Sequence, residues 1–400
     1  MKHRQALAYF GGAPAFAQPL HVAQLNLPEW ERIESRFRDI FRRHFFANNG
    51  PLVQALDVAF ADYAGVEHAV SVTNGTLGLM ILARALEISG EVIVPAFTFP
   101  ATAQAVAWAG LTPVLADVLP ASHMIAPKTV APLLTRQTVG IIGVHVWGRP
   151  CDPDGLQAFA AERNLTLFYD ACHAIGCTHR GRRIGGFGSG EVFSYHATQV
   201  LNAAEGGCIT TNDPRLADRL RTMRNFSPGQ TFASVPTRIN GKMSEAQAAL
   251  ALLSLEDLPD NIAANCARHD WYAAGLAEIP GVDLVRYPDG EDSNFQHVVI
   301  EIDADRSGID RDIVFDLLAA ENVLCRRHFA PGLHQLPYFA ARGAAARGNG
   351  YPVTDRLCAT VMQLPTGGTL ARSDVERICH LIRCIVGDAE TIVARIGGRP

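Results

Sequence analysis

Residues that could bind a phosphorylated, aromatic ligand recur at points where predicted strands end. Thr73-Asn74-Gly75-Thr76 closes one strand and opens a helix. Small residues at such a turn let the backbone approach a phosphate, and the first N–H groups of the helix point toward it. An ordinary helix cap has the same residue types, so this segment alone is compatible with either role.

Asp170 and His173 follow another strand, the apolar run that begins at Leu165. A carboxylate at the carboxyl end of a strand can hold a pyridinium nitrogen protonated, which makes that ring an electron sink. His173 can contact a ring hydroxyl or a substrate. In isolation a surface acid or helix cap is favoured for Asp170, and a hydrogen-bonded core histidine for His173.

Phe99, Ser194 and His196 also lie just after strands or at their ends. An aromatic side chain such as Phe99 can stack on a planar cofactor, although core packing is the commoner role of a single Phe. Ser194 and His196 are polar groups at the end of an apolar run. No GxSxG motif surrounds Ser194, so the pair does not indicate a hydrolase.

The elements that must position these residues alternate between strand and helix from residue 67 onward. This alternation predicts an α/β fold with a mostly parallel, buried sheet flanked by helices, and ligands bind beyond the carboxyl ends of such strands. The predicted strands are 68–72, 92–95, 113–117, 140–146, 165–170, 191–195 and 208–211.

Helical patterns flank the sheet. Apolar spacing predicts a helix over 29–46, and Ser244-Glu245-Ala246-Gln247 is a capping box that opens a later one. A connecting helix then leads to a small α+β domain, whose last helix we expect Ser373 to cap. We therefore predict an N-terminal segment with a large cofactor-binding domain over 1–260, and a connecting helix with a small C-terminal domain over 261–400.

Composition narrows the function classes. The chain is 48% hydrophobic with a net charge of −5, and neither a Lys/Arg block nor an apolar run of membrane-spanning length is present, so no nucleic-acid or membrane partner is expected. Nine scattered cysteines without a CxxC pair indicate reduced thiols in the cytoplasm. Cys172, His173, Cys177 and His179 fit no common zinc spacing, so no metal is expected.

Taken together, the order and spacing of these segments resemble the DegT/DnrJ/StrS-type sugar aminotransferases, which bind pyridoxal 5′-phosphate (PLP) on a type I fold. The resemblance runs from about Gly11 to the C-terminus. It rests on Asn48-Asn49-Gly50-Pro51, Asn74-Gly75-Thr76, Glu91 to Pro95, Val144 to Gly148, Asp170 to Ala174, Ser194 to Gly207, Asn240 to Glu245 and Phe329 to His334.

The resemblance implies a role for each matching residue. Gly75, Thr76 and Ser194, with Asn74 beside them, would hold the phosphate. Phe99 would stack on the pyridine ring, Asp170 would pair with its nitrogen, and His173 would lie near the ring oxygen. Asn240 would reach the phosphate across a homodimer interface, so that two chains build each site, and His334 would lie near the sugar of a nucleotide-linked substrate.

Gln199 departs from the family pattern, because relatives carry their Schiff-base lysine at this position. A carboxamide neither condenses with an aldehyde nor titrates near neutral pH. General acid–base help is worth ~10²–10⁴-fold, so ordinary transamination is not expected. We expect PLP or pyridoxamine 5′-phosphate (PMP) to be held noncovalently, with His173 or His196 left to move a proton.

Three accounts of Gln199 stay open at this point. The chain can be a repurposed enzyme acting on a keto- or amino-sugar in antibiotic or surface-glycan synthesis, as relatives with histidine here are PMP-dependent sugar dehydratases. It can be a non-catalytic paralogue that binds cofactor, sugar or a partner subunit. The glutamine can also be an engineered replacement of lysine. Only Lys2, Lys128 and Lys242 remain as amines, and the resemblance places Lys242 near the partner's site.

Overall fold

A seven-stranded sheet forms the centre of the molecule. The computed structural model describes residues 7–22, 26–226, 237–341 and 350–397. The strand order is β2-β10-β9-β6-β5-β3-β4, with β10 antiparallel to both its neighbours and the other pairs parallel. All seven predicted strands are present: β2 (His68–Val72), β3 (Glu91–Pro95), β4 (Thr112–Ala116), β5 (Thr138–Val144), β6 (Thr166–Asp170), β9 (Glu191–Ser194) and β10 (Gly207–Thr211).

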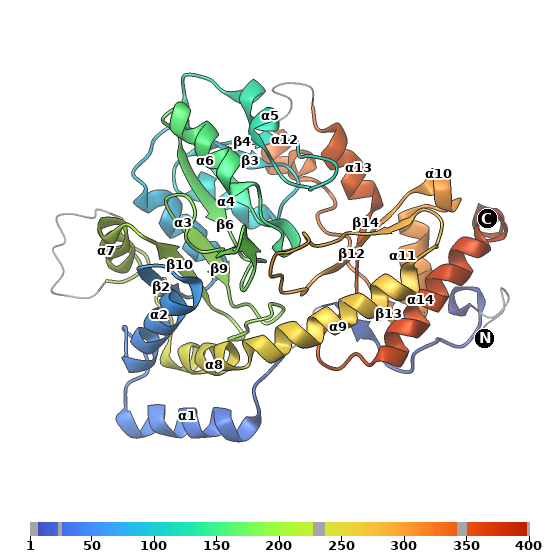
Figure 1. Ribbon diagram of the computed structural model, residues 1–400, viewed down its shortest axis with the longest axis horizontal. Helices are drawn as coiled ribbons and strands as arrows, with labels where there is room; N and C mark the ends of the chain where they lie inside the picture. Colours follow the sequence, from blue (N-terminus) through green and yellow to red (C-terminus); the bar gives the residue numbers. More distant parts are fainter. Residues whose placement is uncertain (1–6, 23–25, 227–236, 342–349, 398–400) are drawn as a thin grey trace.

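Helices cover both faces of this sheet (Figure 1). Successive residues of β3 show why: Val92 and Val94 belong to one apolar cluster and Ile93 to another, because alternate side chains of a strand point to opposite faces. Both faces are thus buried, as the apolar strand sequences predict. The covering helices are α2 (Pro51–Ala64), α3 (Gly75–Ala85), α4 (Pro100–Trp108), α6 (Pro153–Glu162), α7 (Pro214–Met223) and α8 (Glu245–Glu256).

A second, smaller sheet lies in the C-terminal part, where β12 pairs antiparallel with both β11 and β14. Its strands are β11 (Val282–Leu284), β12 (Val298–Ile302) and β14 (Val361–Leu364). The helices α9 (Leu258–Leu276) and α14 (Arg372–Gly387) lie side by side along it (Figure 1). Mixed large sheet and small antiparallel sheet together confirm the predicted fold class. The boundary at residue 260 falls in the first turn of α9 and stays a prediction.

The remaining elements are short or peripheral. The N-terminal strand β1 (Leu20–His21) pairs in parallel with β13 (Val323–Leu324) of the C-terminal part, and α1 (Trp30–Arg43) packs on α8. The others are β7 (Thr178–His179), β8 (Arg182–Arg183), α5 (Pro127–Val130), α10 (Ala304–Ser307), α11 (Arg311–Ala320), α12 (Pro337–Ala340), α13 (Pro352–Thr360), α15 (Ala389–Gly397), and the 3₁₀ turns Ala8–Phe10, Ala131–Leu133, Val146–Gly148 and Leu333–Gln335.

Helix caps test the local sequence reasoning. The capping box at Ser244 is confirmed, since its Oγ accepts from the Gln247 N–H at 3.3 Å and the Gln247 side chain accepts from the Ser244 N–H at 3.0 Å. The cap expected at Ser373 is wrong. The N-cap is Ala371, whose N–H donates to the Asp374 carboxylate at 3.0 Å, so α14 begins at Arg372, two residues earlier than a cap at Ser373 implies. A further helix, α15, follows it.

Candidate active site

A cavity of about 540 Å³ opens where the carboxyl ends of the large sheet face the small sheet. It brings together most of the residues that the sequence singled out, from four separate loops. Residues of β12, β14 and the segment after β13 form the opposite wall. The lining residues already named are Asn74, Gly75, Thr76, Phe99, Asp170, His173, Ser194, His196 and Gln199.

The start of α3 forms one end of the cavity. Asn74 is its N-cap, and its Oδ1 accepts from the Leu77 N–H at 2.8 Å. A Cβ added at Gly75 would lie 3.0 Å from the Cys172 Sγ and 3.1 Å from the Ser194 Cβ, so glycine permits the close approach of three segments here. The first N–H groups of α3, with the Ser194 hydroxyl beside them, suit a phosphate.

Asp170 supplies a buried carboxylate at the end of β6, with 6% of its surface exposed. Its Oδ2 accepts from the Thr102 hydroxyl at 2.7 Å, and its Oδ1 accepts from the Cys172 N–H at 3.2 Å. These bonds orient the carboxylate in the cavity. Phe99, the N-cap of α4, is 55% exposed and lines the same cavity, so its ring is available for stacking. A pyridine phosphate has a ring nitrogen, a planar ring and a phosphate. Asp170, the Phe99 ring and the start of α3 are suited to these three parts in turn.

Gln199 lies on the loop that follows β9. Its Oε1 accepts from the Gln296 Nε2 at 2.8 Å, and its backbone N–H donates to the His196 carbonyl at 2.9 Å. His196 itself is exposed, and its Nδ1 lies 2.9 Å from the Thr198 hydroxyl. The position expected for the Schiff-base lysine therefore lies in the cavity wall and carries a carboxamide.

Three histidines of the cavity surround Trp147. The ring of His173 stacks on Trp147 with centroids 6.1 Å apart, and it lies 4.4 Å from the ring of His297. Burial, with a smaller effect of His328, lowers the pKa of His173 to about 3. Burial, with the charge of Arg326, lowers the pKa of His328 to about 4, and burial also depresses the pKa of His297. All three imidazoles are neutral at neutral pH.

Sequence reasoning missed the wall contributed by the small sheet, namely Arg326, His328, Gln363 and His297. Gln363 is fully buried within the short strand β14, and His297 immediately precedes β12. Polar residues within or beside short apolar strands were the feature of the sequence that could have indicated this wall of the cavity.

Two predicted site residues lie outside the cavity lining. His334 pairs with Asp355 at 2.8 Å and stacks on Tyr351 at 4.4 Å. Asn240 is exposed, and its Oδ1 accepts from the Lys242 Nζ at 2.5 Å. An exposed Asn240 is the arrangement that a residue serving a second copy requires, and a single chain does not test that role.

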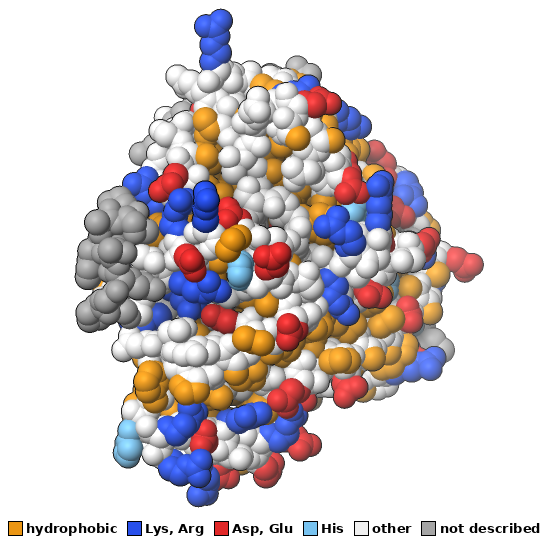
Figure 2. Space-filling view, turned by 60° about the vertical axis from the view of Figure 1, so that its left-hand side comes forward, with side chains coloured by type: hydrophobic (Ala, Val, Ile, Leu, Met, Phe, Trp, Pro, Cys, Tyr) orange, Lys and Arg blue, Asp and Glu red, His pale blue; other side chains and the backbone are white. Residues whose placement is uncertain are grey.

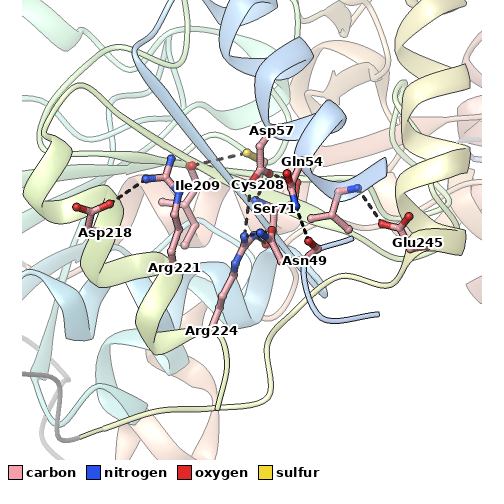
Figure 3. A network of polar contacts seen from close by, with 11 residues as sticks. Asn49, Gln54, Asp57, Ser71, Cys208, Ile209, Asp218, Arg221, Arg224 and Glu245 are labelled. Atoms are coloured by element: carbon pink, nitrogen blue, oxygen red, sulfur yellow. Dashed lines mark hydrogen bonds and ion pairs between the residues drawn. The ribbon is translucent and has the colours of Figure 1, made fainter. Parts of the chain in front are cut away.

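Arg224 lies in a polar network with Asn49, Asp57 and Ser71 (Figure 3), and its backbone also contacts the segment that carries Asn240. Arg224, which follows α7, points toward Asn49 and Ser71 and donates to the Asn49 Oδ1 at 2.8 Å and to the Ser71 carbonyl. The Arg224 carbonyl accepts from the Gly241 N–H at 3.0 Å, and the Gly241 carbonyl accepts from the Thr73 N–H at 2.8 Å. Asn240 is thereby placed beside the strand end that leads into α3.

Two negative findings concern the described part of the chain. Within it no group of three or more His, Cys, Asp or Glu side chains has the geometry of a metal site. The described helices include none long and apolar enough to cross a membrane.

The large mixed sheet and the small antiparallel sheet have the architecture of the sugar aminotransferases, a PLP-dependent class of fold type I. The sequence profile of the DegT/DnrJ/EryC1/StrS aminotransferase family matches residues 29–383, and the chain belongs to this family. It is 32% identical over 367 residues to the dTDP-4-amino-4,6-dideoxy-D-glucose transaminase of Shigella dysenteriae, covering 92% of this chain and 99% of that one. The Escherichia coli enzyme of the same name is 29% identical over 364 residues, covering 90% and 97%.

Solved structures agree. DesI, crystallised in the presence of its TDP-sugar product, superposes with a TM-score of 0.94 at 41% identity, covering 99% of this chain and 100% of that one. DesV of S. venezuelae superposes with a TM-score of 0.82 at 27% identity, covering 91% and 99%. The large and small sheets described above are therefore those of sugar aminotransferases.

Proposed function

We propose that this protein binds PLP or PMP noncovalently in the cavity and acts on a nucleotide-linked keto- or amino-sugar in antibiotic or surface-glycan synthesis. The supporting observation is that Gln199 lines the same cavity as Asp170, Ser194 and the start of α3. Ordinary transamination is not expected, because the resemblance to the family places Gln199 at the position of the cofactor lysine. The scattered reduced thiols favour a cytoplasmic location.

Each part of the cavity would serve one part of the cofactor. The first N–H groups of α3 and the Ser194 hydroxyl would hold the phosphate, and Phe99 would stack on the ring. Asp170, buried and oriented by Thr102, would keep the ring nitrogen protonated. The bound cofactor supplies an electron sink. The protein then has to move a proton without an amine at position 199.

Imidazoles in the cavity support an enzyme over a purely binding paralogue. Burial keeps His173 and His328 neutral but makes them weak bases, so either would need a nearby negative charge on the bound ligand to take up a proton at neutral pH. No hydrogen bond to the ring of His328 comes from another described residue. A PMP-dependent dehydration of a nucleotide keto-sugar is the alternative reaction class, and a non-catalytic paralogue is the alternative to an enzyme.

We further propose a homodimer in which Asn240 serves the partner's cavity. Asn240 is exposed, yet its segment is held firmly beside Thr73. Trp30, Phe41 and Phe46 expose 65%, 63% and 47% of their surface on and after α1. Aromatic side chains so exposed favour burial against a second copy.

Absorption spectra with PLP, followed by borohydride reduction and peptide mass analysis, test the missing tether. The natural chain is expected to show PLP binding and no coenzyme mass on Lys2, Lys128 or Lys242. Gln199→Lys is expected to give a shifted absorption band and one modified peptide, at residue 199.

The same variant allows a turnover assay. With an amino donor and a panel of nucleotide keto-sugars, we expect it to transaminate at least ~100-fold faster than the natural chain. Covalent PLP on any lysine of the natural chain would contradict the proposal.

A second assay addresses the reaction class. Purified protein is incubated with PMP and the same keto-sugars, and products are separated by mass. Loss of water from the sugar, abolished in His173→Asn or His328→Asn, supports dehydration. Binding of cofactor with no product from any sugar would favour the non-catalytic paralogue instead.

A further inference from the structure

The carboxamide of Gln199 is held by Gln296, a residue 97 positions further along the chain. Gln296 lies just before β12 and is 4% exposed. Its Nε2 donates to the Gln199 Oε1 at 2.8 Å. A contact across this distance in sequence joins the large-sheet loop to the small-sheet wall of the cavity.

The orientation of the Gln296 side chain is determined by its neighbours. Its Oε1 accepts from the backbone N–H of Val200 at 2.9 Å, and a backbone N–H can only donate. The Nε2 must therefore lie on the opposite side. There it faces the Gln199 Oε1 at 2.8 Å, which is its shortest contact, the His297 Nε2 at 3.1 Å and the His173 carbonyl at 3.2 Å. Asn294 supports this arrangement, since it accepts from the Gln296 N–H at 3.1 Å and donates to the same carbonyl at 2.8 Å.

The orientation of Gln296 decides which end of Gln199 faces the cavity. Because Nε2 of Gln296 is a donor, it must meet the oxygen of Gln199, which leaves the Gln199 nitrogen at the other end. No described residue accepts a hydrogen bond from that nitrogen, and Gln199 lines the cavity. Position 199 thus presents its N–H donors to the cavity, while its oxygen faces Gln296.

We propose that Gln296 is a positioning residue that turns the Gln199 amide so that the site selects a ligand carbonyl, the aldehyde of PLP, over the aminomethyl group of PMP. This inference rests on the proposed function, because it assumes that the cofactor occupies this cavity. An aldehyde oxygen accepts from the Gln199 N–H groups. The aminomethyl group, protonated like a lysine side chain, offers donors only and leaves two donor groups facing each other.

Equilibrium binding measures this selectivity without turnover. Dissociation constants are obtained from tryptophan fluorescence at pH 7.5 for PLP, for PMP and for 4-deoxypyridoxine 5′-phosphate, whose methyl group provides the baseline. The natural chain is expected to bind PLP about tenfold more tightly than the baseline compound and PMP more weakly than it. Borohydride-treated samples confirm that PLP binding is not attachment to a lysine.

Two substitutions at Gln296 separate positioning from contact. Gln296→Glu replaces the donor by an acceptor. The Gln199 amide group is therefore expected to rotate by half a turn, so that its nitrogen donates to the introduced carboxylate and its oxygen faces the cavity. The preference then reverses, and PMP binds more tightly than PLP. Gln296→Met removes the hydrogen bond, and Gln199→Ala removes the amide; both are expected to bring PLP and PMP to within about threefold of each other. Gln104→Glu, on the exposed surface of α4, is the matched control and keeps the natural ratio.

The outcomes distinguish the two proposals. If the natural chain binds neither PLP nor PMP, the proposed function fails. If it binds both and the ratio is unchanged in Gln296→Glu, Gln296→Met and Gln199→Ala, the cofactor proposal stands and the positioning role is wrong. Circular dichroism identifies a misfolded Gln296 variant, and Gln199→Ala then carries the test, because its side chain is only partly buried.

Discussion

At the scale of single residues, the cavity combines one buried carboxylate with three neutral imidazoles and no amine. Asp170 is held by hydroxyl and backbone donors, and His173, His297 and His328 are kept uncharged by burial. Their side chains come from three separate parts of the chain. Because position 199 carries a carboxamide, these neutral and weakly basic imidazoles are the candidates for moving a proton in the cavity.

Acid is expected to destabilise the protein through these histidines. A histidine has a pKa near 6.5 when unfolded, whereas those of His173 and His328 are about 3 and about 4 in the fold. Between these values the unfolded chain binds more protons, so the free energy of unfolding falls as the pH drops from about 6.5 toward 4. Urea unfolding at pH 7.5, 6 and 5 measures the loss.

The control for this prediction is a histidine variant. His328→Gln is expected to lose less stability than the natural chain between pH 7.5 and pH 5, because one buried imidazole is gone. His21→Gln, at an exposed position, should follow the natural chain. Equal losses in all three proteins would show that His328 does not contribute.

At the scale of elements, one carboxylate ties three helices together. Glu245, in the first turn of α8, is fully buried and accepts from the N–H groups of Leu52 and Val53 at the start of α2, each at 3.1 Å (Figure 3). The Arg43 Nη1 at the end of α1 lies 3.6 Å away. The same turn thus caps α8 through Ser244 and caps α2 through Glu245.

Removing that carboxylate should cost far more than removing an exposed one. Glu245→Ala leaves two buried N–H groups without an acceptor, while Arg43 keeps its ion pair with Asp39. The free energy of unfolding is expected to fall by about 2–4 kcal/mol. Glu256→Ala, on the exposed end of α8 near Arg32, should change it by less than about 1 kcal/mol. Urea denaturation measures both, and similar losses would contradict the capping role.

Helix and strand positions were largely predictable, because they follow local patterns. The seven strands lie within a few residues of the predicted ranges, and Ser244 caps α8 as expected. The cap of α14 was mispredicted because Ser373 is a residue type typical of caps, whereas the helix begins after Ala371 and Asp374 in its first turn accepts from the Ala371 N–H. The small-sheet wall was missed because His297 and His328 come near Gln199 through tertiary contacts alone.

At the scale of the whole molecule, the proposed dimer determines whether each cavity is complete. Acidic and basic side chains are interspersed on the face shown in Figure 2, and apolar ones form a band just above the level at which Figure 1 places α1. Phe41 in α1 and Phe46 after it are both exposed. An interface there would bury aromatic area that a lone copy leaves in water.

Sedimentation and cofactor titration test the shared site together. A dimer is expected, and Asn240→Asp is expected to weaken PLP binding about tenfold, because it brings a carboxylate toward the phosphate. Asn164→Asp, at an exposed turn of one chain, should leave the affinity unchanged. A monomer that binds PLP fully, or an unaffected Asn240→Asp variant, would refute the shared site.

The sequence by itself determined the order of strands and helices, the family, and the presence of a carboxamide at position 199, because these depend on local periodicity and on motif identity. Tertiary structure alone decided which end of that carboxamide faces the cavity. The reason is physical: a donor must meet an acceptor, and the Gln296 Nε2 meets the Gln199 Oε1 only after folding brings the two sheets together.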